Sequence, residues 1–137
     1  MDIAKIIYKG KLRTEATHLK SGQSIITDAP VDNNGKGEAF SPTDLLSTSL
    51  GACMLTIMGI AANNHAIDLG HVEVIIGKHM GTDPRRVVQI DVKMQIQDNG
   101  LSEKNKKILE NAALTCPVAK SLSAEINQNI SFEYVKG

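Results

Sequence analysis

Two cysteines, Cys53 and Cys116, carry the side chains of this sequence that most readily perform covalent chemistry. They lie far apart in the chain, so they form neither a C-x-x-C redox pair nor a recognisable metal-ligand spacing. Only the thiolate form of a cysteine is a good nucleophile, so a reactive cysteine needs a neighbour that stabilises this charge. Each cysteine can therefore be a redox centre or an inert buried thiol, and the elements around them bear on the choice.

Cys53 lies in a segment whose pattern predicts a long helix. In Ser41-Pro42-Thr43-Asp44, Ser41 is suited to the N-cap, Pro42 to the first helical position, and Asp44 to a carboxylate that reaches back to the cap. Apolar residues then recur every three or four positions, which predicts a helix to about residue 64 with one buried face. That face consists of Leu46, Leu50, Cys53, Ile57 and Ile60.

Cys116 precedes a proline, and this order predicts a different environment. Pro117 disfavours a helical conformation at Cys116 and can itself begin a short helix that runs to Ala124. As the N-cap of that helix, Cys116 has its sulfur near free N–H groups and the positive end of the helix dipole, which favours a thiolate. The alternative is a boundary residue packed under Leu122, and both interpretations remain open.

Alternating apolar and polar residues predict strands on both sides of the long helix. The expected hairpin covers residues 3–17 with its turn at Lys9-Gly10, and a third strand covers 24–27. Two strands within 72–97, joined by a turn at 82–85, precede a helix from Ser102 to about Leu114 and a last strand at 130–134. This order predicts an α+β architecture with helices on an antiparallel sheet, and the length of 137 residues predicts one domain, 1–137.

The composition indicates which kinds of binding partner are not expected. Fifteen basic and fifteen acidic residues cancel without a basic run, so nucleic acid is not expected to bind. The N-terminus has no signal-peptide pattern, and serines and threonines make residues 45–62 too polar for a membrane span. We therefore expect a cytoplasmic protein, whose reducing compartment disfavours a structural disulfide. No metal or bound cofactor is expected, since the four histidines are scattered and no glycine-rich phosphate motif follows a strand.

Two charged residues could support a reactive thiol. Arg13 is the one arginine outside the Arg85-Arg86 turn, and its planar fork can hold a thiolate and a carboxylate together, although an ordinary solvated strand residue fits as well. Asp44 precedes Cys53 by about nine residues, or roughly 13 Å along a helix axis. It therefore cannot contact Cys53 of its own helix, and it serves as a capping residue or acts through an arginine or a partner chain.

Two stretches resemble the OsmC/Ohr family (osmotically inducible protein C and organic hydroperoxide resistance protein). The sequence SPTDLLSTSLGAC at 41–53 is similar to the family helix S-P-x-E/D-L-L-x-x-x-L-G-x-C, and TCPVAKSL at 115–122 is similar to its second-cysteine segment C-P-V-x-x-x-L. Thr43 stands where the established hydroperoxide reductases have a glutamate that pairs with an arginine. Because the acidic residue is instead Asp44, the sequence most resembles a less characterised OsmC-like branch.

The resemblance implies a fold of antiparallel sheets wrapped around central helices in an intertwined homodimer. It also implies a thiol peroxidase that reduces organic hydroperoxides in oxidative-stress defence. Cys53 is then the peroxidatic cysteine, which becomes a sulfenic acid, and Cys116 resolves it to a disulfide. Arg13 and Asp44 complete the expected catalytic set, and an external dithiol, lipoyl-type in several members, restores the thiols.

Two other functions remain open. A stress or binding protein on the same fold would hold a hydrophobic small molecule, and Thr43 and the small, apolar residues of the long helix favour it. A hydrolase or acyl-binding protein could use Cys53 as its nucleophile, although the sequence offers no histidine that we can pair with it.

Overall fold

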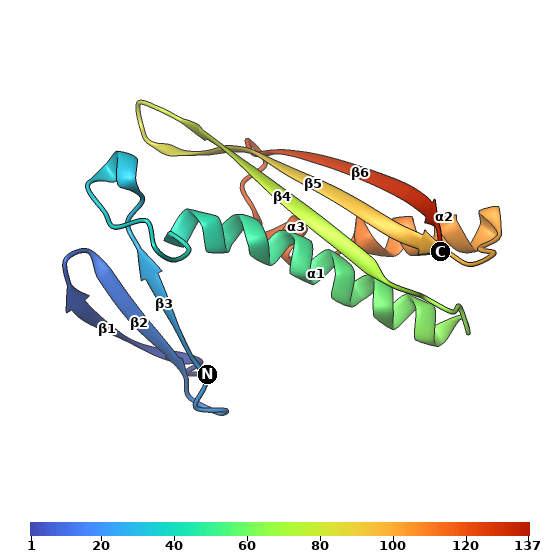
Figure 1. Cartoon of the computed structure of the whole chain (residues 1–137), viewed down its shortest axis with the longest axis horizontal. Coiled ribbons are helices and arrows are strands. Elements are labelled where there is room, and N and C mark those ends of the chain that lie inside the picture. The colour runs from blue at the N-terminus through green and yellow to red at the C-terminus, as the bar shows by residue number, and fades with distance from the viewer. The chain divides into compact units, whose positions relative to one another are not determined.

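The computed structural model describes all residues, 1–137, and the chain forms two compact units, Met1–Leu46 and Ser47–Gly137. Figure 1 labels the helices and strands along the chain. Strands and helices are both present in the order expected, and the α+β class is confirmed.

The first unit contains an antiparallel sheet in the order β1-β2-β3, made by β1 (Ala4–Gly10), β2 (Arg13–His18) and β3 (Ser24–Asp28). Its hairpin turn lies at Lys11-Leu12, two residues later than expected. Both residues have positive φ angles, 54° and 64°, which two-residue hairpin turns favour because their twist matches that of the strands. A single 3-10 turn, η1 (Val31–Asn33), follows β3.

One face of this sheet is apolar and uncovered within its own unit. The register places Ile6 opposite Ala16, and Ala16 opposite Ile25. Ile6 is 67% exposed, Tyr8 64% and Ile25 52%. A three-stranded sheet gains its stability by burying such a face, so this surface is suited to a further covering element.

The second unit contains a sheet in the order β4-β5-β6, made by β4 (Val72–Gly81), β5 (Arg86–Asp98) and β6 (Asn127–Lys136). β4 is antiparallel to β5, as expected, whereas β6 is parallel to β5. The sheet is therefore mixed, and not antiparallel throughout. The reason is that α2 (Glu103–Ala113) and α3 (Pro117–Ser121) form a crossover between β5 and β6, so the two strands run in the same direction.

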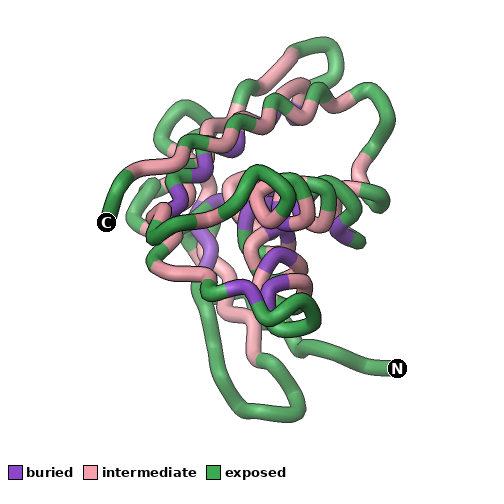
Figure 2. Tube along the Cα trace, turned by 90° about the vertical axis from the view of Figure 1, so that its right-hand side faces the viewer, coloured by how far each residue is buried: buried purple, intermediate pink, exposed green.

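The core of the second unit lies between the inner face of this sheet and the helices. α1 (Pro42–Asn64) and α2 bring their apolar faces against the central strand β5, and Figure 2 shows the buried stretches along the trace. The fully buried apolar side chains are Leu50, Met54, Met58, Ile90, Val92, Met94, Ile96, Leu109, Ala113 and Cys116.

The buried face of α1 differs from the predicted one. Leu46 and Ile60 are 40% and 50% exposed, so the prediction for them is wrong. The reason is that small residues face the sheet: a Cβ on Gly51 would lie 2.6 Å from Cδ1 of Ile76, a contact too close for most side chains. The helix is therefore rotated toward its small residues, and its buried face is Ser47, Leu50, Gly51, Met54, Met58 and Ala62.

By length and composition alone, α1 could cross a membrane, contrary to the expectation that its serines and threonines make it too polar. The core helix of a soluble protein can have the same length and composition. Leu50, Met54 and Met58 of α1 pack in the core of the second unit.

Candidate functional site

The two cysteines come together in the second unit. Cys53 lies in the middle of α1, and Cys116 lies in the bend between α2 and α3. Both are free thiols, and Cys53 lies near enough to Cys116 to raise the pKa of its thiol. Sequence spacing alone does not predict this proximity, since it results from packing α1 against the bend.

The two thiols differ in their access to solvent. Cys116 is completely buried, and it belongs to the core together with Leu109 and Ala113. Cys53 is partly exposed and packs against the rim of the same core. A reagent from solvent therefore reaches Cys53 more easily than Cys116.

Cys116 is the N-cap of α3, which is one of the two interpretations that the sequence leaves open. Its backbone is extended, with φ −65° and ψ 147°, and Pro117 occupies the first turn. The backbone N–H of Ala119 donates a hydrogen bond to Sγ of Cys116 over 3.3 Å. The helix ends at Ser121, three residues earlier than expected, but its capped first turn forms as the proline indicates.

The surroundings of Cys116 act in opposite directions on its thiol. Burial raises the pKa most, the N–H of Ala119 lowers it, and the neighbouring Cys53 raises it again, with a smaller lowering from the N–H of Val118. The net effect is a raised pKa, so Cys116 is a protonated thiol at neutral pH. In this state it is a poor competitor for an electrophile that reaches the site from solvent.

Arg13 lies in the first unit and is held by two carboxylates. Its Nε is 2.7 Å from Oδ1 of Asp28, and its Nη2 is 2.8 Å from Oδ2 of Asp28 and 2.9 Å from Oε1 of Glu38. The bidentate pair raises the pKa of Arg13 and lowers that of Asp28. Arg13 is therefore an ion-paired residue and not merely a solvated one.

Sequence reasoning missed both carboxylates. The strand register could have identified Asp28, because Arg13 and Asp28 are directly paired across β2 and β3. Asp28 is buried and also accepts a hydrogen bond from the N–H of Glu38 over 3.2 Å, so the loop carrying Glu38 is fastened to the same carboxylate.

Asp44 caps α1. Its Oδ2 accepts the backbone N–H of Ser41 over 2.9 Å, and its own N–H donates to Oγ of Ser41 over 3.0 Å. These reciprocal bonds form the predicted capping box. Thr43 has its hydroxyl 3.2 Å from that of Ser41, so it too belongs to the start of the helix.

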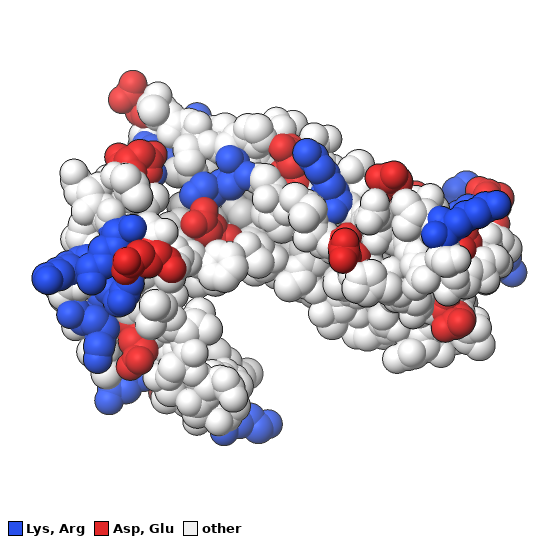
Figure 3. All heavy atoms as spheres, viewed as in Figure 1, with Lys and Arg blue, Asp and Glu red and all other residues white.

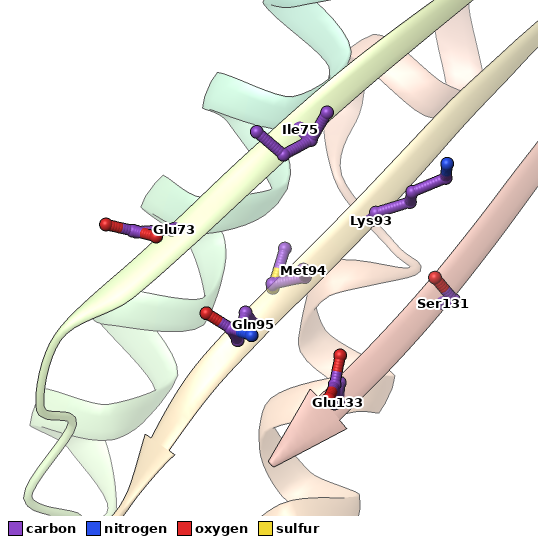
Figure 4. Close-up of a pocket in the computed structure, with 7 residues that line it drawn as sticks. All are labelled: Glu73, Ile75, Lys93, Met94, Gln95, Ser131 and Glu133. Atoms are coloured by element: carbon purple, nitrogen blue, oxygen red, sulfur yellow. The ribbon is translucent and has the colours of Figure 1, made fainter. Parts of the chain in front are cut away.

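A shallow hollow of about 170 Å³ lies on the sheet of the second unit, and Figure 4 shows its side chains spread over β4, β5 and β6. The cysteines pack against the core on the inner face, and most of the hollow is formed by polar residues of the outer face. It contains no cysteine and is not part of the cysteine site. Its lining residues are Glu73, Ile75, Lys93, Met94, Gln95, Ser131 and Glu133.

A polar network joins the three strands on this outer face. His79 Nε2 lies 2.7 Å from Oδ2 of Asp91, and the side-chain amides of Gln89 and Asn129 donate to Oδ1 over 2.7 and 3.0 Å. Led by the bond from His79, these contacts lower the pKa of Asp91 to about 2. His79 is an exposed histidine with a structural partner.

No group of three or more histidine, cysteine or acidic side chains lies close enough to hold a metal ion. Figure 3 shows basic and acidic side chains on the same visible surface, in keeping with the equal numbers of both in the sequence.

A model of the OsmC-like protein family matches residues 35–131. No curated protein matches the chain. Among solved structures, a Psychrobacter arcticus protein with a suggested role in osmotic stress and detoxification is 51% identical, with a TM-score of 0.91 and coverage of 97% of this chain and 96% of that one.

Two more distant structures share the fold. An OsmC-like protein from Mycoplasma pneumoniae is 17% identical, with a TM-score of 0.81 and coverage of 98% of both chains. An organic hydroperoxide resistance protein OsmC from Legionella pneumophila is 20% identical, with a TM-score of 0.70 and coverage of 97% of this chain and 96% of that one.

Proposed function

The chain belongs to the OsmC-like protein family, and from this premise we propose that it is a thiol-dependent peroxidase that reduces organic hydroperoxides. The family and its solved relatives support a stress role related to hydroperoxide resistance. One observation carries the finer proposal: two free thiols are neighbours at the same core, one partly exposed and the other buried at a helix cap.

The proposed reaction begins at Cys53. Its thiolate attacks the terminal, hydrogen-bearing oxygen of the hydroperoxide, the O–O bond breaks, and the alkyl-bearing oxygen leaves as an alkoxide that takes a proton to become an alcohol. Cys53 is now a sulfenic acid. Sγ of Cys116 then attacks the sulfur of Cys53 and expels water, which leaves a Cys53–Cys116 disulfide. An external dithiol, for example a lipoyl-type one, reduces this disulfide and is itself oxidised, so no bound cofactor is needed.

Access and charge support this division of roles. A peroxide that arrives from solvent meets the partly exposed Cys53 before the buried Cys116. The raised pKa of Cys116 keeps it protonated until Cys53 has been oxidised. A sulfenic acid formed beside it then has an adjacent thiol partner, which favours a disulfide over further oxidation.

Arg13 and Asp44 enter the proposal as supporting residues. A guanidinium is suited to stabilise both the thiolate of Cys53 and the leaving oxygen. Asp28 and Glu38 hold the guanidinium of Arg13 in a fixed orientation. We assign Asp44 to the organisation of the helix start, because its carboxylate is bonded to the N–H of Ser41. Thr43 stands at the position where the established hydroperoxide reductases of the family have a glutamate.

We also propose that the protein is a cytoplasmic homodimer without nucleic-acid or membrane partners. The exposed apolar face of the β1-β2-β3 sheet and the exposed Ile60 of α1 supply surface that a second copy can bury. A reducing compartment keeps both thiols reduced between turnovers.

The test is steady-state consumption of cumene hydroperoxide with a dithiol as reductant. We expect Cys53→Ser to abolish turnover, because the one remaining thiol, that of Cys116, is buried and protonated. Cys116→Ser should still form a sulfenic acid on Cys53 but turn over poorly. Thr56→Ser, on an exposed position of the same helix, is the control and should keep full activity. Full activity in Cys53→Ser would refute the proposal.

A second candidate is a binding protein for a hydrophobic small molecule. An open hollow of about 630 Å³ in the first unit favours it, and this volume suits a small ligand. Native mass spectrometry of freshly purified, reduced protein tests it: a co-purifying ligand that does not react with either thiol supports binding over peroxidase activity. The hollow is lined by Ile25, Ile26, Gly37, Glu38, Ala39, Phe40 and Asp44.

A further inference from the structure

We propose that the dithiol which reduces the oxidised protein attacks the sulfur of Cys53, and that Cys116 is always the leaving sulfur. This inference rests on the proposed function, because it concerns the Cys53–Cys116 disulfide. It identifies the cysteine that carries the mixed disulfide with the reductant.

The first argument is access. A thiolate attacks a disulfide sulfur from the side opposite the bond that breaks, so one sulfur must be open on its far side. Cys116 has no exposed surface, and Leu109 and Ala113 belong to the core around it. Cys53 is partly exposed on α1. An external thiolate therefore has a path to Cys53 and none to Cys116.

The second argument is the fate of the leaving charge. The backbone N–H of Ala119 is directed at Sγ of Cys116 over 3.3 Å, and that of Val118 also favours the thiolate there. When the disulfide breaks, these donors stabilise the charge that develops on the leaving sulfur. Cys53 lies inside α1, where the backbone N–H groups are engaged in helical hydrogen bonds. It has no comparable backbone donors to receive a leaving thiolate.

The donors at Cys116 are fixed in place. Pro117 begins α3, so the N–H groups that follow are presented to the cap residue. The side chain of Gln128 donates to the carbonyl of Ala119 over 3.0 Å and fastens α3 to β6. The leaving group is therefore received by an arrangement that already exists in the reduced protein.

The exchange balances as two displacements. The first sulfur of the dithiol forms a bond to Sγ of Cys53, the Cys53–Cys116 bond breaks, and Cys116 takes the electron pair and then a proton. The second sulfur of the dithiol attacks the first, releases Cys53 as a thiol, and closes the reductant into a disulfide. Two electrons pass from the dithiol to the protein.

The test uses the full chain with its disulfide formed by diamide, an oxidant of thiols that is independent of peroxide. The oxidised protein receives 2-mercaptoethanol as a monothiol probe, is quenched with acid at early times, and is alkylated and mapped by mass spectrometry. We expect the probe on Cys53 at about tenfold or greater excess over Cys116. An equal distribution, or an excess on Cys116, overturns the inference.

Two variants test the role of the leaving group. Ala119→Pro removes the N–H that faces Cys116, whereas Ala119→Gly keeps it. We expect the disulfide of the proline variant to be reduced several-fold more slowly than that of the glycine variant, and equal rates overturn the assigned role of this N–H. If the proline variant does not fold, the mass-spectrometric mapping of the probe in the unaltered protein decides which cysteine is attacked.

The outcomes separate this inference from the proposed function. If diamide forms the disulfide but hydroperoxide does not, the peroxidase proposal fails, and the mapping still decides the site of attack. If diamide forms no Cys53–Cys116 disulfide, the inference itself is overturned.

Discussion

Replacing Cys116 by serine and by alanine separates its structural contribution from its chemistry. The buried sulfur accepts the N–H of Ala119 as the cap of α3, and it also fills space in the core. A serine oxygen can accept the same N–H, since serine is a preferred N-cap residue, whereas alanine leaves the N–H without a partner. The two variants therefore differ in the cap and share the loss of the thiol.

The expected magnitudes follow from these contacts. Loss of an N-cap acceptor costs about 1 kcal/mol, and removing a buried sulfur leaves a small cavity that costs about 1 kcal/mol more. Cys116→Ala should therefore lower the free energy of unfolding by about 2 kcal/mol. Cys116→Ser should lose about 1 kcal/mol, for placing a hydroxyl in an apolar site. For a chain of this length the serine variant should melt about 4 °C above the alanine variant.

The assay is urea unfolding under reducing conditions, followed by circular dichroism, with thermal melts for comparison. Protein concentration is held constant, because the unfolding of the proposed dimer would depend on it. Both variants should be equally impaired in peroxide turnover, since neither can form the disulfide. An alanine variant as stable as the serine variant would refute the capping role of Cys116.

Three further predictions concern other parts of the chain. The hydrogen bonds from Arg13 lower the pKa of Asp28, so Asp28 contributes stability that is present above the ordinary carboxyl pKa and is lost as the pH falls below it; in acid urea titrations Asp28→Asn should lose less stability than the unaltered chain. Burial raises the pKa of Tyr134, so its contribution to the free energy of unfolding is lost as the pH rises past about 10. In urea unfolding, Tyr134→Phe should cost about 1 kcal/mol at neutral pH, and it should lose less stability than the unaltered chain when the pH is raised. Met58→Ala should cost about 3 kcal/mol in urea unfolding because Met58 is fully buried, and Ile75→Ala, on the exposed face of β4, less than about 1 kcal/mol; equal costs would contradict the assignment of the α1 face.

The features that depend on local sequence were predictable. Ser41 and Asp44 lie three positions apart and form a capping box, and Cys116 caps α3 because Pro117 follows it. In each case the chemistry that determines the structure lies within one turn of helix.

The features that depend on tertiary packing could not be predicted from the sequence. The buried face of α1 is set by the close approach of Gly51 to Ile76, a contact between distant segments that apolar periodicity does not encode. The parallel pairing of β6 with β5 depends on the path of α2 and α3. Periodicity predicts that β6 is a strand but leaves its neighbour and its direction open.

The residues of the candidate site could be identified from the sequence, but their mutual positions could not. The family resemblance drew attention to Cys53 and Cys116, and packing supplies their proximity and their different burial. Arg13 was selected because it is isolated in the sequence, but its partners Asp28 and Glu38 depend on strand register and on the loop after β3. A single sequence does not specify register without a turn signal, and here the turn lies two residues later than expected.

The measurement that tests the central claim most directly is a single-turnover count of thiols. Reduced protein receives one equivalent of cumene hydroperoxide or of hydrogen peroxide, is quenched within seconds, and is mapped at Cys53 and Cys116 by mass spectrometry. The account predicts rapid loss of both thiols to a Cys53–Cys116 disulfide, faster with the organic peroxide. Two free thiols after minutes with either peroxide would contradict it.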